Sequence, residues 1–412
     1  MSPAPTPPRA WIVVALLFVF FILSFADRVV VGLAGTPIMA DLELTANQFG
    51  LAQSVFFWFF AVGALAGGMA LGRVPVRWLL AGTAVLWAVS LAPLAIVADF
   101  RVLVASRALL GFAEGPTGAM LAWVIHTWFT GPRRATPTAI ASAGAPLGAV
   151  VAAPALTMII TRADWQAAFA VLTIVGLLWV PLWLAFGGQG PIHDQDQSRS
   201  VDATPHPWGA LAYFRRPRIL ALTVLTVAAY VGASANITWL PLYLEHALGY
   251  RPDTVGRLIA AMYAATGILV LLGGLASRWL TVRGASALTA RALLPAALVL
   301  ASGMGVMLFS RVGPGPVSVL LLVSLVPLGS TVLAVIFSGI SDEVPTDSRG
   351  TVFGAIIAIY SVGAAAAPLI VGRSVGADPT AGGYRAGLNA VGIVVVVGAI
   401  SAVAILARRR PS

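Results

Sequence analysis

Residues 11–36 read WIVVALLFVFFILSFADRVVVGLAGT, an almost uninterrupted apolar stretch that is long enough to cross a lipid bilayer. A helix rises about 1.5 Å per residue, so about 20 apolar residues span a hydrocarbon core of about 30 Å. Comparable stretches recur along the chain. Of its 412 residues, 59% are hydrophobic and only 10% are charged, whereas about a quarter of the residues in a soluble domain are charged. The sequence therefore predicts an all-α integral membrane protein.

The apolar stretches, and the Gly, Pro and Arg residues between them, predict twelve transmembrane helices. Their expected ranges are 11–36, 46–71, 77–98, 101–127, 137–160, 167–187, 218–243, 254–276, 285–309, 316–339, 350–372 and 385–407. The first stretch is too long for a signal peptide and lacks a clear cleavage site, so we expect it to remain as a span. The one long polar segment lies between spans six and seven. We therefore expect an N-terminal six-helix bundle (1–187), a cytoplasmic linker (188–217) and a C-terminal six-helix bundle (218–412).

The basic residues predict how the chain is oriented. All 25 of them are arginine, which favours a GC-rich, bacterial origin. With the N-terminus inside, the cytoplasmic segments hold most of these arginines, as the positive-inside rule requires. We therefore expect a multi-pass protein of the bacterial inner membrane with both termini cytoplasmic. The net charge of +10 follows from this topology and does not indicate nucleic-acid binding.

A short motif recurs after spans two and eight. Residues 68–73 read GMALGR and residues 273–278 read GGLASR. Both resemble the loop motif Gly-x-x-x-Asp-Arg of the major facilitator superfamily, although Gly72 and Ser277 replace the usual Asp. The resemblance implies the fold of that superfamily, with two pseudo-symmetric six-helix bundles. It also implies a cytoplasmic gate that includes Gly68, Arg73, Arg77, Gly273 and Arg278.

Four ionisable residues fall inside the predicted spans, namely Asp27, Arg28, Arg107 and Glu114. A charge at membrane depth costs at least about 2.5–3.5 kcal/mol, so such residues indicate function. From the helical rise, Arg107 lies about 9 Å deep, nearly level with Asp27 and Arg28, and Glu114 lies about 10 Å deeper. The alternative is a set of ion pairs that only fixes helix packing, a task that apolar residues perform as well.

Three segments sharpen the resemblance: FADRV at 25–29, RALLGFAEGP at 107–116 and WQAAF at 165–169. They are similar to the anion:cation symporter family, which includes sugar-acid and aromatic-acid permeases. The resemblance implies a secondary active transporter that imports a small organic anion with protons by alternating access. Where members of that family often have Tyr, Gln and Asn, this sequence has Phe60, Ala64 and Ser361. These replacements predict a less polar pocket.

The same resemblance assigns roles to the charged residues. Arg28 would bind the substrate carboxylate, and Arg107 would exchange partners with Asp27. Asp27 and Glu114 would carry the protons. Polar and aromatic groups in spans seven and eleven, which line the cavity in this fold, add two candidate substrate contacts, Asn236 and Tyr360. The aromatic run at 55–60 is expected to form a packed or lipid-facing surface.

Other functions remain as alternatives. A proton-coupled efflux antiporter for drugs or metabolites usually carries a Gly-Pro motif in span five, which GAPLGAVVAAP at 144–154 lacks. A membrane enzyme or a receptor is a remote alternative, because four His, no Cys and no carboxylate cluster offer no metal site or nucleophile. The sequence has no phosphate-binding loop for ATP. We therefore expect no enzyme activity, no cofactor other than protons as coupling ion, no metal, and a monomer whose partners are the anion, protons and lipid.

Overall fold

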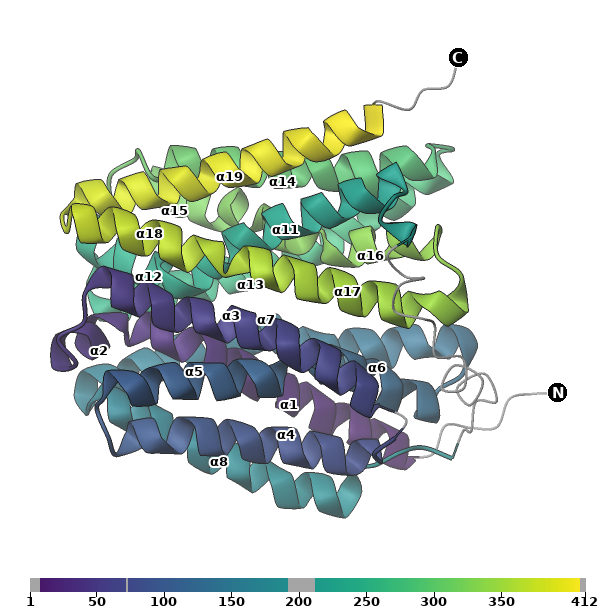
Figure 1. Cartoon of the computed structure of the whole chain (residues 1–412), viewed down its shortest axis with the longest axis horizontal. Helices are drawn as coiled ribbons and strands as arrows, with labels where there is room; N and C mark the ends of the chain where they lie inside the picture. Colours follow the sequence, from purple (N-terminus) through teal and green to yellow (C-terminus); the bar gives the residue numbers. More distant parts are fainter. Residues whose placement is uncertain (1–7, 72, 192–211, 408–412) are drawn as a thin grey trace.

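The structure is a computed structural model that describes residues 8–71, 73–191 and 212–407. Within these residues, twelve helical segments are long and apolar enough to cross a membrane, which confirms the predicted number (Figure 1). Each matches a predicted stretch, with ends that differ by a few residues. Most of the predicted linker, residues 192–211, lies outside the described residues, as does Gly72 of the first loop motif.

The first six spans are α1 (Pro8–Leu33), α3 (Ala46–Ala70), α4 (Val76–Leu91) with η1 (Ala92–Ala95), α5 (Phe100–Glu114) with α6 (Thr117–Trp128), α7 (Ala135–Arg162) and α8 (Trp165–Phe186). The last six are α11 (Pro217–Thr238), α13 (Pro252–Val282), η4 (Thr289–Leu293) with α14 (Leu294–Phe309), α15 (Pro316–Ser324) with η5 (Val326–Thr331) and α16 (Leu333–Ser341), α17 (Thr346–Ala364) with α18 (Ala366–Ala377), and α19 (Ala381–Ala407). Short helical pieces are α2 (Gly35–Asp41), η2 (Gly131–Arg134), α12 (Leu240–Leu242) and the π-helical turn η3 (Tyr243–Ala247).

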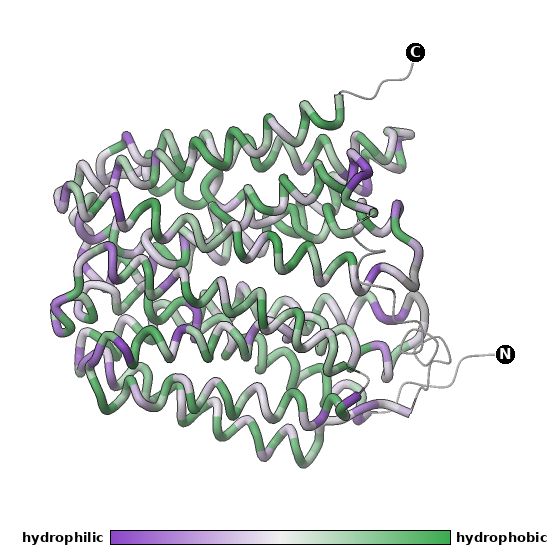
Figure 2. The backbone as a smooth tube through the Cα atoms, viewed as in Figure 1, coloured by the Kyte–Doolittle hydropathy of each residue, from purple (hydrophilic) through white to green (hydrophobic). Residues whose placement is uncertain are grey.

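The outer surface of the helices is apolar. Leu271, Leu275 and Leu320 are 68%, 60% and 62% exposed, which suits contact with lipid rather than water. Hydrophilic residues gather at the two ends of the molecule, and apolar residues dominate between them (Figure 2). Because lipid offers no partner to backbone N–H and C=O groups, helices that satisfy these groups internally are the expected way to cross it. The protein is thus a multi-pass membrane protein.

We name the two ends by their helices. The termini side is the end of the molecule where α1 begins and α19 ends. The closed side is the opposite end, where α2 and α12 lie (Figure 1). Polar caps start three helices at the closed side. Thr45 and Gln48 form a capping box at α3, and Asp99 and Asp164 accept hydrogen bonds from backbone N–H groups at the starts of α5 and α8. These caps satisfy N–H groups that have no partner inside the helix.

The two halves repeat one local structure at the termini side. Arg134 Nε donates to the carbonyl five residues earlier at 2.7 Å, and Nη2 contacts the carbonyl eight residues earlier at 3.5 Å. Arg349 Nε and Nη2 make the corresponding bonds at 2.9 Å each. An arginine therefore caps the carbonyl end of the fourth span and of the tenth span in the same way. This agreement supports the pseudo-symmetry of the halves.

The two halves press together at the closed side. Gly50 and Gly256 each lie four residues after the first residue of α3 and α13. A Cβ on Gly50 would lie 2.5 Å from the carbonyl oxygen of Pro368, and one on Gly256 would lie 2.7 Å from Thr157 Oγ1. Glycine is thus required for both approaches. At the termini side, by contrast, a Cβ on Gly68 would meet no atom within 4 Å.

Hydrogen bonds reinforce the closed side. Thr36 Oγ1 on α2 donates to Glu245 Oε2 at 2.8 Å and lies 2.9 Å from His246 Nε2, both in η3 of the other half. The hydroxyl of Ser54 on α3 donates to the carbonyl of Ala365 at 2.7 Å. The structure therefore shows a conformation in which the halves are sealed at the side opposite the termini.

Replacing Gly50 with alanine should open this seal, because the new Cβ cannot approach the Pro368 carbonyl at 2.5 Å. The chain has no native cysteine, so Ile237→Cys supplies a single thiol behind the seal. We expect Gly50→Ala to raise the rate at which a membrane-impermeant thiol reagent labels Cys at 237 from the closed side severalfold. Gly68→Ala, at an open position, is the matched control. Equal labelling in the two backgrounds would show that Gly50 does not limit opening.

Candidate functional site

Four charged side chains meet in the core of the N-terminal half, and they are the four that the sequence predicts. Asp27 is 3% exposed, Arg107 1% and Glu114 0%, and the Arg28 side chain is 12% exposed. Asp27 and Arg28 come from α1, and Arg107 and Glu114 come from α5. Isolated charges in such a place would be very costly, so their grouping is itself a structural requirement.

One direct ion pair joins the two helices. Nε of Arg28 donates a hydrogen bond to Oε2 of Glu114. Nη1 and Nη2 of Arg28 make no hydrogen bond with any described residue, so most of this guanidinium is available to a ligand. Glu114 is the last residue of α5, and the span resumes as α6 after Gly115 and Pro116. Interrupted helices of this kind form the binding sites of many membrane transporters.

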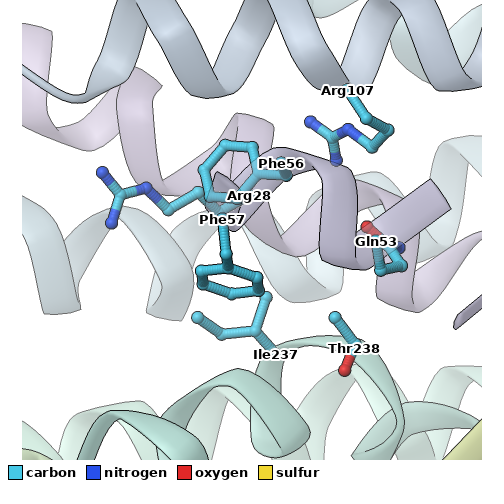
Figure 3. Close-up of a pocket in the computed structure, with 7 residues that line it drawn as sticks. All are labelled: Arg28, Gln53, Phe56, Phe57, Arg107, Ile237 and Thr238. Carbon is cyan, nitrogen blue, oxygen red and sulfur yellow. The ribbon is translucent and has the colours of Figure 1, made fainter. Parts of the chain in front are cut away.

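Arg107 is buried, and two of its donor nitrogens have no hydrogen-bond partner among the described residues. Within the described part of the chain, its Nε and Nη2 atoms are inaccessible to solvent and have no hydrogen-bond acceptor. Its guanidinium carbon lies 5.3 Å from the centre of the Phe56 ring, and that of Arg28 lies 5.9 Å from the same centre. Phe56 lies between the two arginines (Figure 3). A buried guanidinium with open donors is a strong candidate for binding an anion, because leaving such donors unpaired costs free energy.

A small cavity opens beside Arg107, between the two halves. It is lined by Arg28, Gln53, Phe56, Phe57, Arg107, Ile237 and Thr238 (Figure 3). Its volume of about 10 Å³ is roughly what one water molecule needs. Because Ile237 and Thr238 belong to α11, the C-terminal half closes the cavity. A substrate larger than water would therefore have to enter through a movement of the halves.

Comparison with known proteins identifies the fold family. The sequence profile of the Major Facilitator Superfamily matches residues 16–368. The chain belongs to the Major Facilitator Superfamily. In agreement with this membership, a bacterial homologue of the human lysosomal transporter Spinster, solved in an inward-facing and occupied conformation, superposes with a TM-score of 0.82. The two share 16% identity, and the match covers 98% of each chain, so the likeness is one of fold.

Curated relatives within the superfamily carry anions, by their names. The hexuronate transporter of Bacillus subtilis (strain 168) is 26% identical over 268 residues, which are 64% of this chain and 64% of that protein. A probable galactarate/D-glucarate transporter of the same organism is 25% identical over 427 residues, 96% of this chain and 90% of that protein. The chain spans less than two thirds of the length of several curated relatives. These relatives are transporters and not enzymes, and the resemblance to anion transporters is confirmed.

Among the described residues, no hydrogen bond or ion pair joins the superfamily's loop motif to the other half in this conformation. Arg73 Nη1 donates to the Met69 carbonyl of its own helix at 2.6 Å, and Arg77 donates to the Leu184 carbonyl of α8. Arg278 is exposed. A Cβ on Gly273, like one on Gly68, would meet no atom within 4 Å. The gating role of these five residues stays a prediction, and their lack of contact across the halves fits a molecule that is sealed at the opposite side.

The structure places the remaining predicted residues around the charged centre. Asp27 is buried, yet it forms no ion pair with Arg107 or with any other described residue, although the resemblance implies that these two exchange partners. Asn236 is 7% exposed and directly precedes the cavity-lining Ile237, but does not itself line the cavity. Tyr360 is 6% exposed and stacks on Tyr230, with ring centres 3.8 Å apart.

Four cavity residues were missed from the sequence: Gln53, Phe56, Phe57 and Ile237. The aromatic run at 55–60 divides between two environments, because Trp58 and Phe59 are 50% and 43% exposed. A signal was available, since Gln53 is an amide two turns inside an apolar span and shares a helical face with positions 56, 57 and 60. The expectation of a packed or lipid-facing surface was therefore incomplete for this run.

Proposed function

We propose that the protein is a secondary active transporter that imports a small organic anion together with protons. The observation that carries this proposal is the buried guanidinium of Arg107, whose donors are unpartnered at a cavity between the two halves. A packing role alone does not explain unpaired donors at this place, because leaving them unpaired costs free energy. The names of the relatives support an anion as cargo.

The four charges suggest how protons are coupled to the anion. With both carboxylates ionised, the set of two arginines and two carboxylates sums to zero. Protonation of Glu114 would release Arg28 from its ion pair and leave one positive charge for an anion to neutralise. Asp27 would be the second proton carrier. Alternating access would follow from opening of the closed side and approach of the halves at the termini side.

Transport can be tested with purified protein in proteoliposomes. Radiolabelled organic anions should accumulate inside when a pH gradient, acidic outside, is imposed, and accumulation should stop when an ionophore collapses the gradient. Protein-free liposomes control for passive entry. Extrusion driven by the same gradient would instead indicate an efflux antiporter.

We further propose that the protein lies in the bacterial inner membrane with both termini cytoplasmic, and that one chain is the functional unit. Reporter fusions after Arg216 and Arg410 should both read cytoplasmic, and a fusion after Gly249 should read periplasmic. A reporter that reads the opposite compartment at any one of these three sites would contradict the proposed orientation of the twelve spans.

A further inference from the structure

Span eleven is broken near its middle, where α17 ends and α18 begins. Ala365 separates the two helices, and Pro368 follows three residues later. Because proline has no backbone N–H, the carbonyl of Ala364, four residues before Pro368, has no donor within its own helix. Ala364 and Ala365 are both buried, where an unpaired carbonyl costs free energy. The break therefore needs hydrogen-bond donors from elsewhere in the protein.

Two serines supply these donors, one from each half of the protein. Ser54 Oγ on α3 donates to the Ala365 carbonyl at 2.7 Å. Ser234 Oγ on α11 donates to the adjacent Ala364 carbonyl, also at 2.7 Å. Both serines are 0% exposed, so water does not compete for these bonds. The broken span, which belongs to the C-terminal half, is thus tied to the N-terminal half by the hydroxyl of Ser54.

Each serine also has a second acceptor within its own helix. Ser54 Oγ lies 2.9 Å from the Gly50 carbonyl, and Ser234 Oγ lies 3.1 Å from the Val231 carbonyl. A hydroxyl has one hydrogen to donate, and for both serines the shorter distance is the one to span eleven. If α3 moved away from the break, Ser54 would keep the Gly50 carbonyl as acceptor, whereas the Ala365 carbonyl would lose its donor from α3. The hydroxyl can therefore release span eleven without becoming unpaired itself.

The helices that carry the two serines also line the cavity between the halves. Gln53, next to Ser54, lines it from α3, and Thr238 lines it from α11. Thr238 lies one turn after Ser234 and donates its hydroxyl hydrogen to the Ser234 carbonyl at 2.7 Å. The separation of these two cavity walls therefore depends on the contacts that both helices make with the break.

We propose that Ser54 is a positioning residue of the transport cycle. Its hydroxyl holds the break of span eleven against α3 while the closed side is sealed. When that side opens, the hydrogen passes from the Ala365 carbonyl to the Gly50 carbonyl, and the two cavity walls separate. This inference rests on the proposed function, because it describes one step of alternating access, but it does not depend on which anion is carried.

Ser54→Ala removes the hydroxyl that links the halves. In the Ile237→Cys background, we expect it to raise the rate of thiol labelling from the closed side by roughly threefold to tenfold, the effect of losing one hydrogen bond. Ser90→Ala is the matched control, because Ser90 is also buried but donates to the Trp87 carbonyl of its own helix, α4. It should label like the parent protein. Equal labelling of folded Ser54→Ala and Ser90→Ala would overturn the proposal.

Pro368→Ala distinguishes this role from simple packing. It returns an N–H to the break, so the helix can continue and the Ala365 carbonyl gains the N–H of Leu369 as donor. Pro368→Ala should therefore raise the labelling rate by itself, and adding Ser54→Ala should change it further by less than twofold. An unchanged rate in Pro368→Ala would overturn the proposal even if Ser54→Ala does not fold. So would an equal effect of Ser54→Ala in both backgrounds.

The labelling rates are measured without substrate, so they are independent of the transport assay. Unchanged labelling together with anion accumulation in proteoliposomes would overturn the role of Ser54 alone. Absence of accumulation for every anion tested would instead overturn the proposed function.

Discussion

Arg28→Lys is expected to weaken anion binding by roughly ten- to more than a hundredfold while leaving the protein folded. Arginine can bind a carboxylate through two parallel N–H groups, whereas lysine presents a single charged nitrogen. The loss of one hydrogen bond to a charged group corresponds to about 1.5–3 kcal/mol. Arg28 meets the condition for this contact, since only its Nε is used by Glu114. Equilibrium binding in detergent measures the effect.

The control for this variant is Arg101→Lys, which changes an exposed arginine near the start of the same α5 that carries Arg107. It should bind the anion like the unmodified protein. Elution of Arg28→Lys as a single symmetric peak would show that it is folded. If it then binds the anion normally, Arg28 is structural, and the carboxylate must be held elsewhere, with Arg107 as the next candidate.

Glu114→Gln is expected to separate exchange from accumulation. Glutamine resembles the protonated form of Glu114, so Arg28 would be permanently free of its ion pair. Substrate should still exchange across the membrane, but a pH gradient should no longer drive uphill uptake. Glu43→Gln, at an exposed position, should accumulate substrate normally. Asp27→Asn should impair coupling in the same way and weaken binding more, because it lies beside Arg28.

If Asp27 and Glu114 both carry protons, we expect a stoichiometry of two protons per monoanion. An anion entering a cell with a negative interior works against about 2.3 kcal/mol per 100 mV for each net negative charge. One proton makes the entry of a monoanion neutral, and a second makes it favoured by the potential. Reversal-potential measurements give the ratio directly. If Glu114→Gln still concentrates substrate with unchanged dependence on pH and voltage, Asp27 alone carries a coupled proton.

The sequence predicted the spans well because lipid imposes a simple rule on every one of them. It also predicted which four ionisable residues lie inside the spans, because a charge at membrane depth is rare and stands out in an apolar stretch. It did not predict that Arg28 rather than Arg107 pairs with Glu114, since Asp27 and Arg28 point about 100° apart and the rotation of α1 is set by packing. Gln53 and Phe57 were missed for a related reason. Their importance depends on α11, which closes the cavity from the other half.

Gly50 and Gly256 occupy matched positions at the closed side, where each makes a close approach to the other half. The two halves could rotate relative to each other about these two contacts. From Gly50 to the end of α3 at Ala70 is about 30 Å, so a rotation of about 10° moves that end by about 5 Å. Gln53 and Phe57 lie within about 10 Å of Gly50 along the helix and move by less than about 2 Å. The displacement along α3 therefore grows with distance from Gly50. In such a rotation the cavity residues of α3 would move far less than the end of the helix at the termini side.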